Sequence, residues 1–239
     1  MQPQYSIIIP TKNEEESIAK VLCCIPKKIK DYSEILVVDS STDTTPIIAN
    51  KLGTKVIRLK RSGKGRAMKV GVENSRGKIL IFLDGDGTDP PEYIPKLLQK
   101  LKHANLVLGS RSLKDFKRDD LAMRMLFKIN NLSIKPLFRA AGLHIKGDPL
   151  AGFRVIRRTD WENLELKSND FAIEAEMNLK ALENDFVIDE VAIPHLKRIG
   201  GLLNSKFGAN LSQWSKIVNF TLKHIKNKKN KRGAAKFAK

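Results

Sequence analysis

Residues 79–92 read ILIFLDGDGTDPPE, and this stretch decides the class of fold. An uninterrupted apolar run ends in Asp84-Gly85-Asp86, and the chain then breaks at a glycine and paired prolines. A run without polar alternation is typical of a strand covered on both faces, as in parallel α/β sheets. Two carboxylates that flank one small residue at a strand's end can converge on a cation. Such oxygen ligands suit Mg²⁺ or Mn²⁺, which take further ligands from water and substrate phosphates. From this stretch alone, an acidic turn without a ligand remains the alternative.

The same type of run recurs through the first 110 residues. The predicted strands cover residues 5–10, 34–39, 55–59, 78–84 and 106–111. Helix-length segments separate them, so we predict an α/β fold with a mostly parallel central sheet of the nucleotide-binding type. Asn13 before EEESIAKVL predicts a helix cap with acids in the first turn, and Pro91 predicts the start of another helix.

The second half of the chain has a different pattern, and we expect it to complete the sheet and shape an acceptor site. The predicted elements are a helix over about 119–141, a strand at 153–158, a helix at 171–184 and a strand at 186–193.

The C-terminal segment carries most of the net positive charge. The formal net charge of the 239 residues is +18, no acidic residue follows Glu190, and residues 191–239 hold 12 Lys or Arg. An apolar stripe at helical spacing predicts an amphipathic helix that docks either on the core or on a membrane surface. The stripe consists of Phe207, Leu211, Trp214, Val218, Leu222 and Ile225.

The composition of the chain excludes several classes of protein. With 41% hydrophobic residues the chain can build a core, and the adjacent Cys23 and Cys24 exclude a disulfide framework. No apolar run reaches the roughly 18 residues of a membrane span, and the start does not resemble a signal peptide. We therefore expect a cytoplasmic protein, peripheral on the cytosolic membrane face. The basic tail leaves a noncatalytic nucleic-acid-binding protein as an alternative, but no recognised motif supports it, so no nucleic-acid partner is expected.

The ordered set PTKNE, VVDSSTD, GKGRA, LDGDG, GSR, DPLAGF and KRIGG resembles the family-two inverting glycosyltransferases of the GT-A fold. The likeness is greatest to dolichyl-phosphate mannose synthases and related polyprenyl-phosphate sugar transferases, and it covers about residues 4–206. It implies a GT-A domain over residues 1–204, with a nucleotide-sugar half (1–111) and an acceptor half (112–204). Residues 205–239 would then form the amphipathic helix and lysine-rich tail.

This resemblance implies a metal-dependent enzyme that moves a hexose from GDP-mannose or a UDP-sugar to a polyprenyl or dolichyl phosphate. Asp84 and Asp86 would bind Mg²⁺ or Mn²⁺, and Thr88 stands where the lipid-phosphate enzymes often have Gln. The residues implied in nucleotide-sugar binding are Pro10, Thr11, Asn13, Glu14, Asp39, Ser41, Lys64, Asp84 and Arg198.

On the acceptor side, the resemblance implies that Arg111 and Arg124 hold the acceptor phosphate. Asp86 and Arg198 would act at the departing diphosphate. Asp148 or Glu176 would serve as a base if the acceptor were a hydroxyl, since an ionised phosphate needs none. Transfer to a sugar hydroxyl or to a small phosphorylated acceptor therefore stays open, as do the nucleotide and the sugar. A sugar-phosphate nucleotidyltransferase is disfavoured, because PTKNEEE lacks the glycine-rich turn expected after the first strand.

Overall fold

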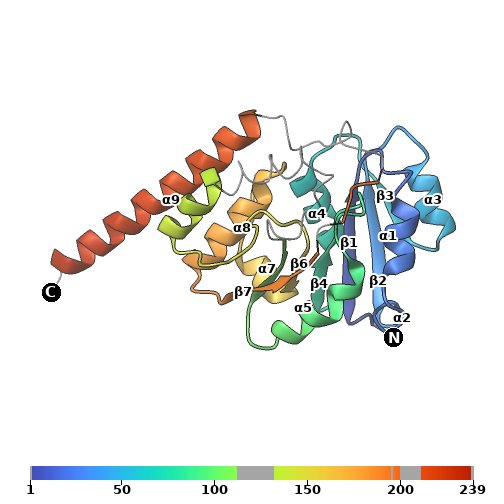
Figure 1. Ribbon diagram of the computed structural model, residues 1–239, viewed down its shortest axis with the longest axis horizontal. Coiled ribbons are helices and arrows are strands. Elements are labelled where there is room, and N and C mark those ends of the chain that lie inside the picture. Colours follow the sequence, from blue (N-terminus) through green and yellow to red (C-terminus); the bar gives the residue numbers. More distant parts are fainter. Residues whose placement is uncertain (1, 112–131, 195, 200–210, 238–239) are drawn as a thin grey trace.

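The computed structural model describes residues 2–111, 132–194, 196–199 and 211–237. Its centre is a seven-stranded sheet in the order β3-β2-β1-β4-β6-β5-β7 (Figure 1). All neighbouring strands are parallel except β6, which runs antiparallel to β4 and β5. The mostly parallel sheet is thereby confirmed. The strands are β1 (Tyr5–Thr11), β2 (Ser33–Asp39), β3 (Lys55–Arg58), β4 (Ile79–Phe82), β5 (Leu106–Ser110), β6 (Arg154–Arg157) and β7 (Ile188–Ala192).

Helices cover both faces of this sheet. They are α1 (Ile18–Cys24), α2 (Lys27–Lys30), α3 (Thr45–Lys51), α4 (Lys64–Glu73), the 3₁₀ turn η1 (Pro91–Tyr93), α5 (Ile94–Lys100), α7 (Arg158–Asn163), α8 (Ala172–Glu183) and α9 (Leu211–Phe237). Residues 132–141 are also helical, in agreement with the second part of the helix predicted over 119–141. Residues 119–131 lie outside the described part of the chain.

The continuous apolar runs arise because the central strands are buried on both sides. Ile7 and Ile9 of β1 pack with α1 and α5 in one core, whereas Ile8 packs with α4 and α8 in the other. All three isoleucines are fully buried. A strand with two buried faces needs no polar alternation, which is the pattern read from the sequence.

Strand register places the polar ends of three strands at one edge of the sheet. Thr11 of β1 pairs with Asp39 of β2, and Asp39 pairs with Arg58 of β3. β1 also pairs in parallel with β4, whose end leads into the Asp84 turn. This carboxyl edge is where open α/β sheets bind ligands.

The predicted helix cap at Asn13 is wrong. The helix begins at Ile18, with Ser17 at the N-cap, and Asn13 has a φ of 53°, in the left-handed region. Its side-chain oxygen accepts a hydrogen bond from Thr42 N at 2.9 Å. The loop after β1 therefore crosses the sheet edge to meet the loop after β2, which delays the start of α1.

The predicted C-terminal helix is confirmed, but its buried face differs from the predicted stripe. Ile217, Thr221 and His224 are buried at spacings of four and three, whereas Leu222 is 48% exposed. Trp214, Val218 and Ile225 pack beside the buried face as predicted. The difference arises because α9 packs on α8, where His224 Nδ1 lies 3.1 Å from Glu183 Oε1. The buried Thr221 hydroxyl donates to Ile217 O within α9 at 2.8 Å. Phe207 and the side chain of Leu211 lie outside the described residues.

Among the described residues, none of the helices combines the length and the apolar character needed to cross a membrane. Cys23 and Cys24 are both free and exposed on α1.

Candidate active site

The loops that follow β1 and β2 are joined through Asp39. The Thr11 hydroxyl donates to Asp39 at 2.7 Å, and Ser41 Oγ donates to the same carboxylate at 2.5 Å. Asn13 N donates in turn to Ser41 Oγ at 2.7 Å. Arg58 at the end of β3 forms an ion pair with Asp39. The structure thus brings together Thr11, Asn13, Asp39 and Ser41, with Pro10 in the adjoining end of β1.

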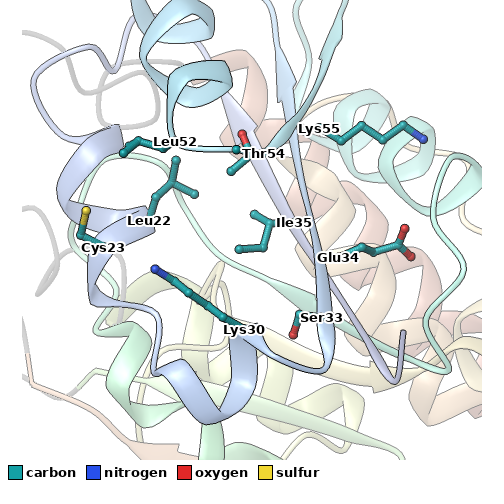
Figure 2. A pocket seen from close by; sticks show the side chains of 10 residues that line it. Leu22, Cys23, Lys30, Ser33, Glu34, Ile35, Leu52, Thr54 and Lys55 are labelled. Atoms are coloured by element: carbon teal, nitrogen blue, oxygen red, sulfur yellow. The ribbon is translucent and has the colours of Figure 1, made fainter. Parts of the chain in front are cut away.

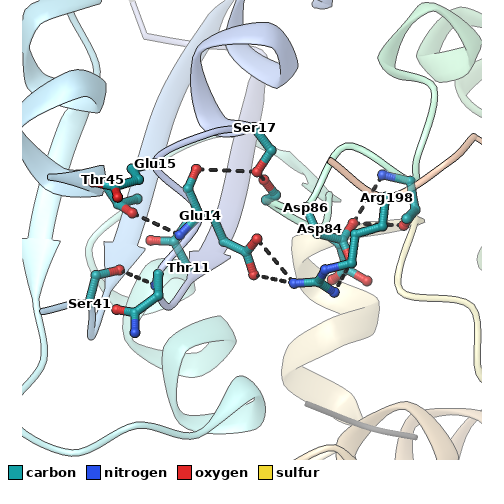
Figure 3. Close-up of polar contacts among 12 residues, drawn as sticks. Thr11, Glu14, Glu15, Ser17, Ser41, Thr45, Asp84, Asp86 and Arg198 are labelled. Carbon is teal, nitrogen blue, oxygen red and sulfur yellow. Dashed lines mark hydrogen bonds and ion pairs between the residues drawn. The ribbon is translucent and has the colours of Figure 1, made fainter. Parts of the chain in front are cut away.

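Arg198 connects the loop after β1 to the Asp-Gly-Asp turn. Its Nη2 lies 2.8 Å from Glu14 Oε1, and its Nη1 lies 2.7 Å from Asp86 Oδ2. Figure 3 shows the guanidinium between the two carboxylates, although Arg198 is far from both in sequence. Asp86 also accepts the Thr88 hydroxyl at 2.7 Å, so Thr88 supports the turn. Sequence reasoning grouped Arg198 with this site, and the geometry places it there.

Lys64 joins the other carboxylate of the turn to α8. Its Nζ lies 2.6 Å from Asp84 Oδ1 and 2.6 Å from Glu174 Oε1. Burial acts to lower the pKa of Lys64, but the charges of Asp84 and Glu174 outweigh burial and raise this pKa above its ordinary value. Burial likewise acts to raise the pKa of Asp84, and Lys64 lowers it below the ordinary value. Lys64 therefore keeps its proton between Asp84 and Glu174, and its charge opposes the rise in the pKa of Glu174 that burial causes.

Asp89 adds a buried carboxylate next to the turn. It accepts the backbone N–H of Asp84 at 3.1 Å and is only 2% exposed. Burial, followed by the charge of Asp84, raises the pKa of Asp89 to about 7. Asp89 therefore holds its proton to a higher pH than an ordinary aspartic acid does.

Arg111 is partly buried beside Asp148, with Nη2 3.8 Å from Asp148 Oδ2. Burial acts to lower the pKa of Arg111, but nearby carboxylates, Asp89 and Asp148 first, raise it. Within the described part of the chain, the Nε atoms of Arg111 and Arg198 are buried without a hydrogen-bond partner. Two unpartnered guanidinium donors near the Asp-Gly-Asp turn suit an anionic ligand such as a phosphate.

The remaining predicted residues of the acceptor side are Glu176 and Arg124. Glu176 accepts the backbone N–H groups of Lys167 and Ser168 at 2.9 and 2.7 Å, so its carboxylate fixes the loop before α8. Arg124 lies outside the described residues.

Sequence reasoning missed Glu174, Asp89 and Arg58. For Glu174, the available signal was a second acid two positions before Glu176 in FAIEAEM.

The Asp-Gly-Asp turn offers two oxygen ligands from the protein. In the described residues, no group of three His, Cys, Asp or Glu side chains is arranged to hold a metal ion. Each of the two carboxylates is paired with a cationic side chain. This donor set fits a divalent cation that completes its shell with water and phosphate oxygens.

A separate pocket lies at the opposite end of β2 (Figure 2). Its lining includes Leu22 of α1, Lys30 of α2 and residues 33–35 at the start of β2. The Asp-Gly-Asp turn contributes nothing to this lining. The pocket is therefore separate from the polar cluster described above.

Residues 6–164 match the family model described as Glycosyl transferase family 2. The chain belongs to this family. It is a glycosyltransferase with a GT-A fold, similar to the dolichyl-phosphate sugar transferases. One relative is a dolichyl-phosphate hexose transferase of Haloferax volcanii, 29% identical over 221 residues that cover 91% of this chain and 93% of the relative.

Two further relatives are longer than this chain. The low-salt glycan biosynthesis hexosyltransferase Agl6 of Haloferax volcanii is 33% identical over 205 residues, which cover 83% of this glycosyltransferase and 49% of Agl6. The dolichol-phosphate mannosyltransferase of Pyrococcus furiosus is 30% identical over 184 residues. These residues cover 73% of this glycosyltransferase and 52% of the relative. The matched regions thus span about half the length of both relatives.

Solved structures show the same fold. Glucosyl-3-phosphoglycerate synthase from Mycobacterium tuberculosis has a TM-score of 0.69 at 22% identity, covering 93% of this glycosyltransferase and 80% of that chain. Mannosyl-3-phosphoglycerate synthase from Rubrobacter xylanophilus also has a TM-score of 0.69, at 18% identity. The match covers 97% of this glycosyltransferase and 75% of the synthase.

Proposed function

We propose that this glycosyltransferase moves a hexose from a nucleotide sugar, GDP-mannose or a UDP-sugar, to a polyprenyl or dolichyl phosphate. The observation that carries the proposal is the Asp84–Asp86 pair at the carboxyl edge, enclosed by Lys64, Arg198 and Arg111. Carboxylates that hold a cation, surrounded by cationic donors, are suited to a diphosphate leaving group. The relatives named for dolichyl phosphate support the lipid acceptor.

The donor site follows from the residues around Asp39. Thr11, Asn13, Asp39 and Ser41 would bind the nucleoside, and Pro10 and Glu14 would shape the same loop. Their hydrogen bonds prearrange the loop before a ligand arrives, which lowers the entropy cost of binding.

Asp84 and Asp86 would hold Mg²⁺ or Mn²⁺, which would neutralise charge on the donor diphosphate. Structural neighbours that hold Mn²⁺ together with UDP or UDP-glucose support this choice of ions. Lys64 and Arg198 would donate hydrogen bonds to the same diphosphate as it leaves. Arg198 would have to exchange Glu14 or Asp86 for a phosphate oxygen, so its loop would rearrange when the donor binds.

Arg111 and Arg124 would hold an anionic acceptor on the opposite face of the sugar, for a single displacement with inversion. An ionised phosphate acceptor needs no strong base. Asp148 lies 3.8 Å from Arg111 and would take the proton if the acceptor were instead a hydroxyl. Glu176 would contribute to the acceptor side by fixing the loop before α8.

The C-terminal segment would place the enzyme on the cytosolic face of a membrane. On α9, Phe220 and Leu222 are exposed, and lysines lie along the same helix. Basic residues near anionic lipid contribute about 1 kcal/mol each. Residues 205–239 would form this docking segment, attached to a GT-A domain over residues 1–204 with donor (1–111) and acceptor (112–204) halves.

Purified protein with Mn²⁺ or Mg²⁺, a short polyprenyl phosphate and a panel of GDP- and UDP-sugars tests the proposal. Mass spectrometry should detect glycosylated lipid with one donor, and Asp86→Asn should abolish it. Asp160→Asn, at a carboxylate paired with Arg157 away from the turn, is the matched control and should retain transfer.

A parallel assay with 3-phosphoglycerate separates the acceptor classes, because two structural neighbours are named for that acceptor. If product formed with 3-phosphoglycerate and none formed with the lipid, the proposed lipid acceptor would be wrong. The proposed donor and metal site would still stand.

A further inference from the structure

We propose that Glu174 is a positioning residue of the transferase site. Its carboxylate shares the Lys64 ammonium with Asp84 and keeps that ammonium in place when a divalent cation occupies the Asp-Gly-Asp turn. This inference deepens the proposed function and rests on it.

The geometry encloses the ammonium on several sides. Lys64 opens α4 and Glu174 lies in the first turn of α8, and these two helices pack together. The side chain of Glu174 is 3% exposed and that of Lys64 is 11% exposed. A Cβ atom at Gly152 would lie 2.6 Å from Lys64 Nζ, so Gly152 closes another side. The ammonium has little room to move away from its two carboxylates.

Charge explains why two carboxylates are present. A buried ammonium is costly unless it is paired. If Asp84 ligated a divalent cation, its ion pair with Lys64 would weaken. The positive charge of the cation would also repel the Lys64 ammonium. Glu174 then remains as the counter-charge. Its contact with Lys64 Nζ would keep this side chain beside the turn, where it could donate to a diphosphate oxygen.

The carboxylate of Glu174 can be tested separately from the packing of α8. Arg154 Nη1 contacts the backbone oxygen of Glu174 at 3.0 Å and does not depend on its side chain. Glu174→Gln keeps the shape of the side chain and removes its charge. The substitution therefore leaves the anchoring of the helix by Arg154 in place.

The experiment is a double-mutant cycle read by binding of Mn²⁺ alone. Free Mn²⁺ is measured by electron paramagnetic resonance during titration into the full-length chain. Glu174→Gln should weaken Mn²⁺ binding about tenfold, because Lys64 then has only Asp84 and competes with the metal for it. In a Lys64→Met background, the same substitution should change the affinity by less than about twofold.

Glu183→Gln, at the far end of α8, is the control and should bind Mn²⁺ like the parent chain. Glu174→Asp restores the charge on a shorter side chain and should recover most of the affinity. Thermal unfolding identifies any variant that fails to fold, and Glu174→Ala, which also removes the charge, replaces Glu174→Gln in the cycle if the glutamine variant does so.

Equal losses in both backgrounds would overturn the inference, because Glu174 would then act without Lys64. Unchanged binding by Glu174→Gln would overturn it as well, while leaving the proposed function intact. A parent chain that binds no Mn²⁺ would overturn the proposed metal site, and the inference with it.

Discussion

At the carboxyl edge of the sheet, Gly152 lies so close to Asp84 that a side chain would displace a charged group. A Cβ atom there would overlap Asp84 Oδ2 and would lie 2.6 Å from Lys64 Nζ. We expect Gly152→Ala to lower kcat by about tenfold or more, because small displacements of reacting or binding groups are costly. Transfer rates and thermal unfolding of the variant check this. An unchanged kcat in a folded variant would show that the turn tolerates the shift.

Asp89 makes the stability of the metal-free protein depend on pH. Burial and the charge of Asp84 raise its pKa from 3.8 to about 7. The folded chain therefore holds this proton more tightly than the unfolded chain does. The resulting stabilisation is complete below pH 4 and is lost as the pH rises through about 7.

Asp89→Asn keeps an oxygen acceptor for the Asp84 N–H and cannot ionise. In the presence of a chelator, the melting temperature of this variant relative to the parent should be higher at pH 8 than at pH 5. Melting curves of both proteins at the two pH values give the comparison. If the melting temperatures of variant and parent differed by the same amount at pH 5 and pH 8, the prediction would be wrong.

At the scale of elements, Arg154 of β6 ties the loop before that strand to α8. It is fully buried, and its guanidinium donates to Ala151 O at 2.6 Å, Pro149 O at 3.1 Å and Asn178 Oδ1 at 2.9 Å. Burial lowers the pKa of Arg154 to about 10, so it stays charged at neutral pH. One side chain thus holds together the loop that carries Asp148 and the helix that carries Glu174.

Arg154→Leu should destabilise the fold by about 3 kcal/mol, since several buried acceptors lose their donor at once. Urea unfolding measures the change. Arg154→Lys should also destabilise, because one ammonium cannot reproduce the planar fork. A leucine variant as stable as the parent would show that the loop and α8 hold their places without this anchor.

Arg154 also shows where prediction from the sequence ends. The strands were predicted within a few residues because a strand buried on both faces leaves an apolar run, and Asp84 and Asp86 follow directly from such a run. An arginine in FRVIRR carries no local sign of full burial. The choice of Glu174 over Glu176 as the partner of Lys64 likewise depends on how α8 packs on α4. Contacts between distant segments decide such positions, and local patterns cannot.

For the whole molecule, the distribution of charge separates a packed body from a basic end. α9 packs on α8 through Ile217, Thr221 and His224, and its end at the C-terminus extends beyond the other elements (Figure 1). Because no acidic residue follows Glu190, nothing in this end offsets its lysines. A basic helix that projects from the body is available to an anionic surface without disturbing the core.

A full-length variant with Gln in place of Lys228, Lys229, Lys231 and Arg232 tests this role. Removing four charges should weaken binding to phosphatidylserine-containing vesicles by at least about tenfold, at roughly 1 kcal/mol for each residue near the lipid. Binding of the parent should fall as salt rises, since the attraction is screened. Vesicle co-sedimentation gives both results, and the melting temperature should not change. A variant that sediments with vesicles like the parent would instead assign α9 to packing on the catalytic domain alone, because its removed charges would then contribute nothing at the lipid surface.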